Sequence, residues 1–134
     1  MGLDSSGAVV GAPGDFKAQA TQAYENIRAA LAAAGGGFEH VVKLTQYLIH
    51  LRAHQALIRE VRASFFNPDL PPPASTMIQV GALTRDGALY EVDAVTLVPV
   101  RASRTQSGAT AAIEPEVFTL AAPAVRRRWK AEPL

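Results

Sequence analysis

Two carboxylates near residue 90 have the residue types and the spacing needed for acid–base chemistry. Glu91 and Asp93 lie two apart in residues 89–98, a run rich in β-branched residues that is typical of a strand. Residues two apart in a strand point to the same sheet face, where Leu89 and Val95 flank this pair. Such a pair could supply an acid and a base. A solvent-facing pair, or an ion pair across a subunit contact, fits the same pattern, and both interpretations remain open.

The histidines are the next candidates for proton transfer or metal binding. His50 and His54 are four residues apart, but His50 closes a predicted strand whereas His54 opens the following helix. No third histidine or nearby acid completes a ligand set, so we expect no metal site. We expect His40, which follows a glycine run, to lie at the surface.

Basic residues form two further groups. Arg59 and Arg62, with Arg52 one or two turns earlier, make a basic edge on a predicted helix. That edge is either a solvated face or a binding site for a carboxylate or another anion. Residues 126–130 read Arg-Arg-Arg-Trp-Lys, which could bind phosphates and stack a base, although so short a run at a chain end is typical of a flexible tail.

The elements that would position these residues follow from periodicity. Asp15 is predicted to cap a helix that ends at the glycines 35–37. Apolar residues then recur at helical spacing: Phe16, Ala20, Ala23, Ile27, either Ala30 or Leu31, and Ala34. A second helix is predicted over 53–66, with Leu57, Val61 and Phe65 on its apolar face, and the prolines at 68 and 71–73 end it.

Strands are predicted over 41–49, 76–80 and 89–98, with a possible short strand at 8–10. Val42, Leu44 and Leu48 should share one face of the first of these. The Asp86-Gly87 pair favours a hairpin turn between the last two. Two helices on one face of a mixed sheet would bury these apolar stripes, so we predict an α+β fold.

Composition and charge limit what the chain can be. It has 134 residues, no cysteine and a net charge of +1, so disulfides and thiolate metal sites are excluded and nucleic acid is not expected. Residues 1–99 hold seven Lys and Arg against nine Asp and Glu, whereas residues 100–134 hold six against three. Because the composition also changes there, we predict a domain over 1–100 and a linker and tail over 101–134. No membrane span or secretory signal is visible, and we expect a cytoplasmic protein.

The order of short motifs resembles the RidA/YjgF family of small enamine/imine deaminases, once described as translation inhibitors or endoribonucleases. The resemblance covers about residues 2–98. Its motifs include Gly2-Leu3-Asp4, Gly7-Ala8-Val9-Val10, Gly14-Asp15-Phe16-Lys17-Ala18-Gln19-Ala20, Asn26-Ile27, Leu31-Ala32-Ala33-Ala34-Gly35, Val41-Val42-Lys43-Leu44-Thr45, Pro73-Ala74-Ser75-Thr76 and Tyr90-Glu91-Val92-Asp93-Ala94-Val95.

The resemblance implies a chorismate-mutase-like α+β fold and a homotrimer with pockets at the subunit interfaces. In deaminase members, an arginine binds the carboxylate of a 2-imino acid or 2-aminoacrylate, and a glutamate positions the attacking water. Hydrolysis of the C=N bond then releases ammonia without a metal or cofactor. The glutamate aligns with Glu91, which makes Glu91 the expected catalytic residue.

The chain departs from the family pattern around this pocket. Deaminase members read Pro-Ala-Arg-Ser where this chain has Ser75 and Thr76, so a hydroxyl replaces the carboxylate-binding arginine. That exchange should cost about 2–4 kcal/mol for a carboxylate substrate. Met77 stands where a small cysteine is common, and Arg59 takes the place of a pocket-edge asparagine. We expect Ser75, Thr76, Met77 and Arg59 to contact a substrate that is not a simple 2-imino acid.

Family members also carry about one more hairpin before residue 2, so we expect an N-terminally shortened member of the family. Two functions remain open at this stage, beside a third, nucleic-acid binding or RNA cleavage, which rests only on the basic run at 126–130 and an old description of the family. One is a RidA-like hydrolase of imines or enamines, and the other is a non-catalytic protein that binds a small molecule or a partner.

Overall fold

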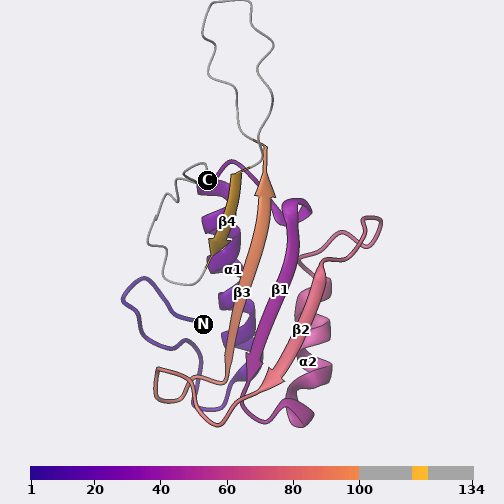
Figure 1. Cartoon of the computed structure of the whole chain (residues 1–134). Helices are drawn as coiled ribbons and strands as arrows, with labels where there is room; N and C mark the ends of the chain where they lie inside the picture. Colours follow the sequence, from indigo (N-terminus) through magenta and orange to yellow (C-terminus); the bar gives the residue numbers. More distant parts are fainter. Residues whose placement is uncertain (100–115, 121–134) are drawn as a thin grey trace, which may run out of the picture.

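The computed structural model describes residues 1–99 together with the backbone of residues 116–120 (Figure 1). The elements are, in order, α1 (Phe16–Ala33), η1 (Phe38–His40), β1 (Val41–Leu48), α2 (Leu51–Ala63), β2 (Ala74–Gln79), β3 (Tyr90–Val98) and β4 (Glu116–Leu120). An isolated antiparallel bridge between Leu3 and Val9 stands where the short strand at 8–10 was predicted.

The strands form one mixed sheet in the order β2-β1-β3-β4. β1 is parallel to β2 and antiparallel to β3, which is itself antiparallel to β4. Figure 1 shows α1 and α2 behind this sheet and its other face toward the reader. The predicted α+β fold, with two helices on one face of a mixed sheet, is therefore confirmed.

The predicted hairpin between β2 and β3 is wrong. Residues 84–87 do turn, with Gly87 at φ +77 and a hydrogen bond from Ala88 N to the Arg85 carbonyl. However, β1 lies between β2 and β3, so the two strands joined by this turn are not neighbours. The Asp-Gly pair fixed the local turn, whereas burial of the apolar strand residues under the helices decided the pairing.

The helix ends follow the sequence signals. The Asp15 carboxylate accepts a hydrogen bond of 3.0 Å from Ala18 N, and Gly35 adopts φ +82 after the last turn of α1. The predicted stripe of α1 is buried from Phe16 to Leu31, whereas Ala34 is the half-buried C-cap. The helix also buries the polar side chains of Gln19 and Tyr24. The second helix, α2, begins and ends earlier than the predicted 53–66, and Ile58 and the predicted Val61 are its buried residues. The predicted Leu57 is partly buried against the same core, as is Phe65, which follows the end of α2.

The buried face of β1 differs from the prediction at one residue. Leu44 and Leu48 are fully buried, but Val42 is 42% exposed. The pairing with β3 shifts between Val41 and Lys43, and this irregularity turns Val41 inward instead of Val42.

β4 lies in the segment that was predicted to be a tail, and it extends the sheet beyond β3. The predicted linker 101–113 and the basic run 126–130 are outside the described residues, and the boundary at residue 100 stays a prediction. None of the described helices is long and apolar enough to cross a membrane.

Gln19 should be the polar residue of α1 on which stability depends most. Its amide oxygen accepts from Leu89 N at 2.8 Å and its amide nitrogen donates to the Gly87 carbonyl at 3.0 Å. Gln19→Leu leaves both backbone groups without these partners, so the free energy of unfolding in urea should fall by about 1–3 kcal/mol. Gln22→Leu is the control, because Gln22 bonds only Asn26 on the same helix and should cost less than about 0.5 kcal/mol. Equal losses in both variants would contradict this role.

Candidate active site

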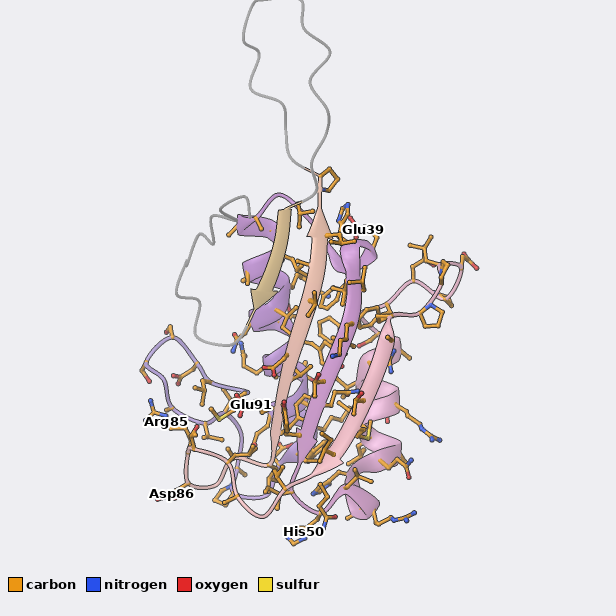
Figure 2. All side chains as sticks on the ribbon, in the orientation of Figure 1. Glu39, His50, Arg85, Asp86 and Glu91 are labelled. Atoms are coloured by element: carbon orange, nitrogen blue, oxygen red, sulfur yellow. The ribbon has the colours of Figure 1, made fainter. Side chains whose placement is uncertain are left out.

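The face of the sheet that no described helix covers carries both candidate carboxylates. On β3, Tyr90, Val92 and Ala94 point into the core, so the alternate residues Glu91 and Asp93 point to the open face and are half-buried. Figure 2 shows Glu91 near the start of β3, close to the loop that holds Arg85 and Asp86. The sequence prediction that Glu91 and Asp93 share a face is confirmed.

Strand register defines the neighbours of these carboxylates. Tyr47 lies between Glu91 on β3 and Ile78 on β2. Two residues earlier on β1, and on the same face of the sheet, Thr45 lies between Asp93 on β3 and Thr76 on β2. Directly opposite residues have Cβ atoms about 4.5–5.5 Å apart, so Tyr47 and Thr45 lie beside the two carboxylates, whereas Thr76 lies one strand farther away.

The two negative charges act on the groups around them. Asp93 raises the pKa of the Tyr47 hydroxyl through its charge and through a hydrogen bond, and Glu91 adds to the effect. Burial lowers the pKa of the Met1 amino group, while the charges of Glu91 and Asp93 oppose that change. Tyr47 therefore stays a neutral hydrogen-bond donor beside the carboxylates over a wide range of pH.

Ser75 and Met77 lie on the opposite face of the sheet from Glu91. Ser75 pairs with Leu44 and Met77 with Gln46, and both of those β1 residues point into the core under the helices. Met77 packs against the core, whereas Ser75 is exposed at the edge of the sheet. The Ser75 hydroxyl accepts a hydrogen bond of 2.9 Å from the buried amide of Gln46.

Arg59 lines a cavity of about 390 Å³ at the end of α2. Its other lining residues come from the last turns of α2 and from the loop to β2: Arg62, Ala63, Phe66, Asn67, Pro68, Leu70, Pro72 and Pro73. The Arg62 guanidinium lies over the Phe66 ring, 5.5 Å from its centre. Neither arginine has an ion pair with an acidic group of residues 1–99. Two cations beside apolar walls suit an anionic ligand with an apolar part.

The five predicted site residues thus divide into two groups within one chain. Glu91 and Thr76 lie on the open face, while Ser75, Met77 and Arg59 lie on the side of the helices. Gln46 is a residue that the sequence reasoning missed. Its signal was a polar residue at an inward position of β1, between Leu44 and Leu48.

The histidines do not form a site. His50 precedes α2 in a left-handed conformation with φ 54. The His54 ring stacks on Phe16 at 4.1 Å, and burial lowers the pKa of His54. The structure groups no set of three potential metal ligands among the residues it describes.

Comparison with known proteins agrees with this fold. The family described as endoribonuclease L-PSP matches residues 1–98. "Protein DfrA" of Myxococcus xanthus is 42% identical over 84 residues, which are 63% of this chain and 61% of that protein. The 2-iminobutanoate/2-iminopropanoate deaminase of Mus musculus is 37% identical over 98 residues, 72% of this chain and 68% of that protein.

Among solved structures, RidA from the Antarctic bacterium Psychrobacter sp. PAMC 21119 superposes with a TM-score of 0.61 at 34% identity, covering 69% of this chain and 71% of that one. The chain therefore belongs to the endoribonuclease L-PSP family, which is the RidA/YjgF family. It spans less than two thirds of the length of the M. xanthus relative.

The pKa of Tyr47 should report directly on the carboxylate pair. Asp93 raises the pKa of Tyr47 more than Glu91 does. Asp93→Asn removes its negative charge, so the pKa of Tyr47 should move down toward its ordinary value. Glu91→Gln should move it in the same direction but less. The shifts can be measured from the ring signals of Tyr47 in an NMR titration. An unchanged Tyr47 signal in Asp93→Asn would contradict the contact.

Proposed function

We propose that this protein hydrolyses the C=N bond of imine or enamine intermediates, with Glu91 as the catalytic residue. The observation that carries the proposal is a half-buried carboxylate on the open sheet face, at the position where the family resemblance implies a water-positioning glutamate. The mammalian relative named as an iminobutanoate/iminopropanoate deaminase supports the same reaction class.

The proposed hydrolysis requires one side chain of the protein that accepts and returns protons. The imine reacts in its protonated form: the Glu91 carboxylate accepts a proton from water as the water oxygen adds to the imine carbon, which gives a neutral carbinolamine. Glu91 returns this proton to the nitrogen. The C–N bond then breaks as the hydroxyl proton passes to Glu91 and the carbonyl forms, and Glu91 gives that proton to the departing ammonia, which leaves as ammonium. We propose that no cofactor takes part and that the reaction occurs in the cytoplasm.

The remaining predicted residues would select the substrate. Ser75 and Thr76 offer hydroxyl groups and Met77 offers apolar surface, where the family pattern has an arginine, a serine and a cysteine. One hydroxyl cannot replace a bidentate guanidinium. We therefore propose a substrate other than a simple 2-imino acid, with Arg59 binding an anionic group farther from the reacting carbon.

We propose further that three chains assemble and that the pockets lie between them. Glu91 and Ser75 sit on opposite faces of one sheet, so one chain does not bring them together. On the open face, Ile78 is 41% exposed and Leu97 is 40% exposed. A second chain covering this face would bury both side chains and could add its own residues to the pocket.

A non-catalytic role in ligand binding is the second candidate, and the loss of the family arginine at Ser75 favours it. The two candidates differ in one result. A hydrolase releases ammonia from imines generated enzymatically from several amino acids, including 2-aminoacrylate. If the protein only binds ligands, its NMR signals should shift when the corresponding 2-oxo acids are added, and no ammonia should be released from the imines.

Glu91→Gln should abolish hydrolysis while the fold is kept, because the amide is nearly isosteric but cannot accept the proton from water. Ammonia release should fall at least a hundredfold on any imine that the wild type hydrolyses. Asp93→Asn is the matched control, since it removes the same charge from the same face and should keep at least a third of the activity. Activity of Glu91→Gln within threefold of wild type would mean that another group positions the water.

Light scattering at micromolar concentration should give about three times the 14.2 kDa mass of one chain. Ile78→Asp places a charge on the open face and should shift the mass toward one chain. Ala53→Asp is the control, because Ala53 is exposed in the first turn of α2, away from the open face and from the Arg59 cavity, and should not affect assembly. A single-chain mass for the wild type would refute the trimer.

A further inference from the structure

A group of polar side chains lies in the middle of the apolar core, under the helices. Tyr24 on α1, Gln46 on β1 and Tyr90 on β3 are each fully buried. The Tyr90 hydroxyl lies 2.9 Å from Gln46 Oε1 and 3.2 Å from the Tyr24 hydroxyl, and the Tyr24 hydroxyl lies 3.4 Å from the same Oε1. Burying these groups is costly unless each has a hydrogen-bond partner.

The two tyrosines determine how the Gln46 amide is oriented. Burial raises the pKa of both hydroxyls, so each keeps its proton and must donate it to an acceptor. Oε1 lies within hydrogen-bond reach of both hydroxyls, so it can accept from each, and it faces the tyrosines. The Nε2 group is then turned the other way, toward β2.

The orientation of Gln46 in turn fixes the hydroxyl of Ser75. Nε2 donates to Ser75 Oγ at 2.9 Å, at the exposed edge of the sheet. Because the oxygen accepts from Gln46, the O–H hydrogen of Ser75 points away from the core. Among the described residues, the hydroxyl is thus available as a donor.

We propose that Gln46 is a positioning residue, which holds Ser75 as a hydrogen-bond donor toward a carboxylate or carbonyl oxygen of the ligand. The inference rests on the proposed role of Ser75 in substrate binding and deepens it. A serine without this support would rotate freely between donor and acceptor orientations, and it would lose entropy on binding. The buried Gln46 amide therefore fixes the orientation of the Ser75 hydroxyl, whereas the planar guanidinium of the family arginine has fixed donor directions of its own.

The test is an NMR titration with 2-oxoglutarate, whose carbonyl and carboxylate oxygens can accept from Ser75 and whose second carboxylate offers the distal anionic group proposed for Arg59. Ser75→Ala and Gln46→Met should each weaken binding about three- to tenfold, the range expected for one hydrogen bond. The double variant should bind no more weakly than the weaker single variant, because both changes remove the same interaction. Ser75→Thr keeps the hydroxyl and should bind within about twofold of wild type.

Thr96→Val separates binding from stability. Thr96 is also fully buried, and its hydroxyl donates to the His40 carbonyl at 2.9 Å, away from Ser75. This variant should lower the melting temperature and leave the affinity unchanged. The inference is overturned if Gln46→Met binds as tightly as wild type, if the losses in the double variant multiply, or if the wild type does not bind the probe.

A second measurement does not depend on whether Gln46→Met folds. The side-chain amide signals of Gln46 in the wild type should shift when 2-oxoglutarate is added, and this shift should disappear in Ser75→Ala. A shift that persists in Ser75→Ala would overturn the inference.

The affinity readout also separates this inference from the proposed function. Glu91→Gln should lose ammonia release and keep its affinity for the probe. Activity in that variant would remove the proposed function alone, whereas tight binding by Gln46→Met would remove the positioning role alone.

Discussion

The central position of β1 is the constraint on which the rest of the structure depends. Its backbone pairs on both sides, with β2 in parallel and with β3 antiparallel, so residues of three strands are locked in rows. Successive residues of a strand point to opposite faces. Leu44 and Leu48 therefore join the core only if Thr45 and Tyr47 face outward, and the same rows send Glu91 and Asp93 outward. A slip of one residue would exchange every side chain between the faces, and the apolar burial under α1 and α2 opposes such a slip.

The same alternation separates the candidate site residues. Chemistry by Glu91 would occur on the open face, while recognition by Ser75 and Arg59 would occur on the side of the helices. A catalytic glutamate and a ligand-binding hydroxyl on opposite faces can serve one substrate only where chains meet. The proposed assembly and the proposed activity are thus linked by geometry.

The elements were predictable because each had a local signal in the sequence. Asp15 capped a helix whose apolar residues recur at helical spacing, and Glu91 and Asp93 stood at alternate positions of a strand. Strand order was not predictable in this way, since the turn at Asp86-Gly87 fitted a hairpin equally well. Val42 was wrongly predicted to face the core, because the apolar pattern of the sequence does not reveal the register shift between Val41 and Lys43. Gln46 was missed because its partners, Tyr24 and Tyr90, come from distant parts of the chain.

The three prolines at 71–73 have a consequence for the solubility of the protein. β2 pairs only with β1 among the described strands, so its other edge presents unpaired backbone groups, and Ile78 is exposed on it. Such an edge is a template for the addition of strands from other molecules, which leads to aggregation. Proline lacks an N–H donor, so the chain just before Ala74 cannot lengthen the ladder. Among the described residues, the prolines therefore limit this edge to the six residues of β2, which shortens the template available for fibril-like association.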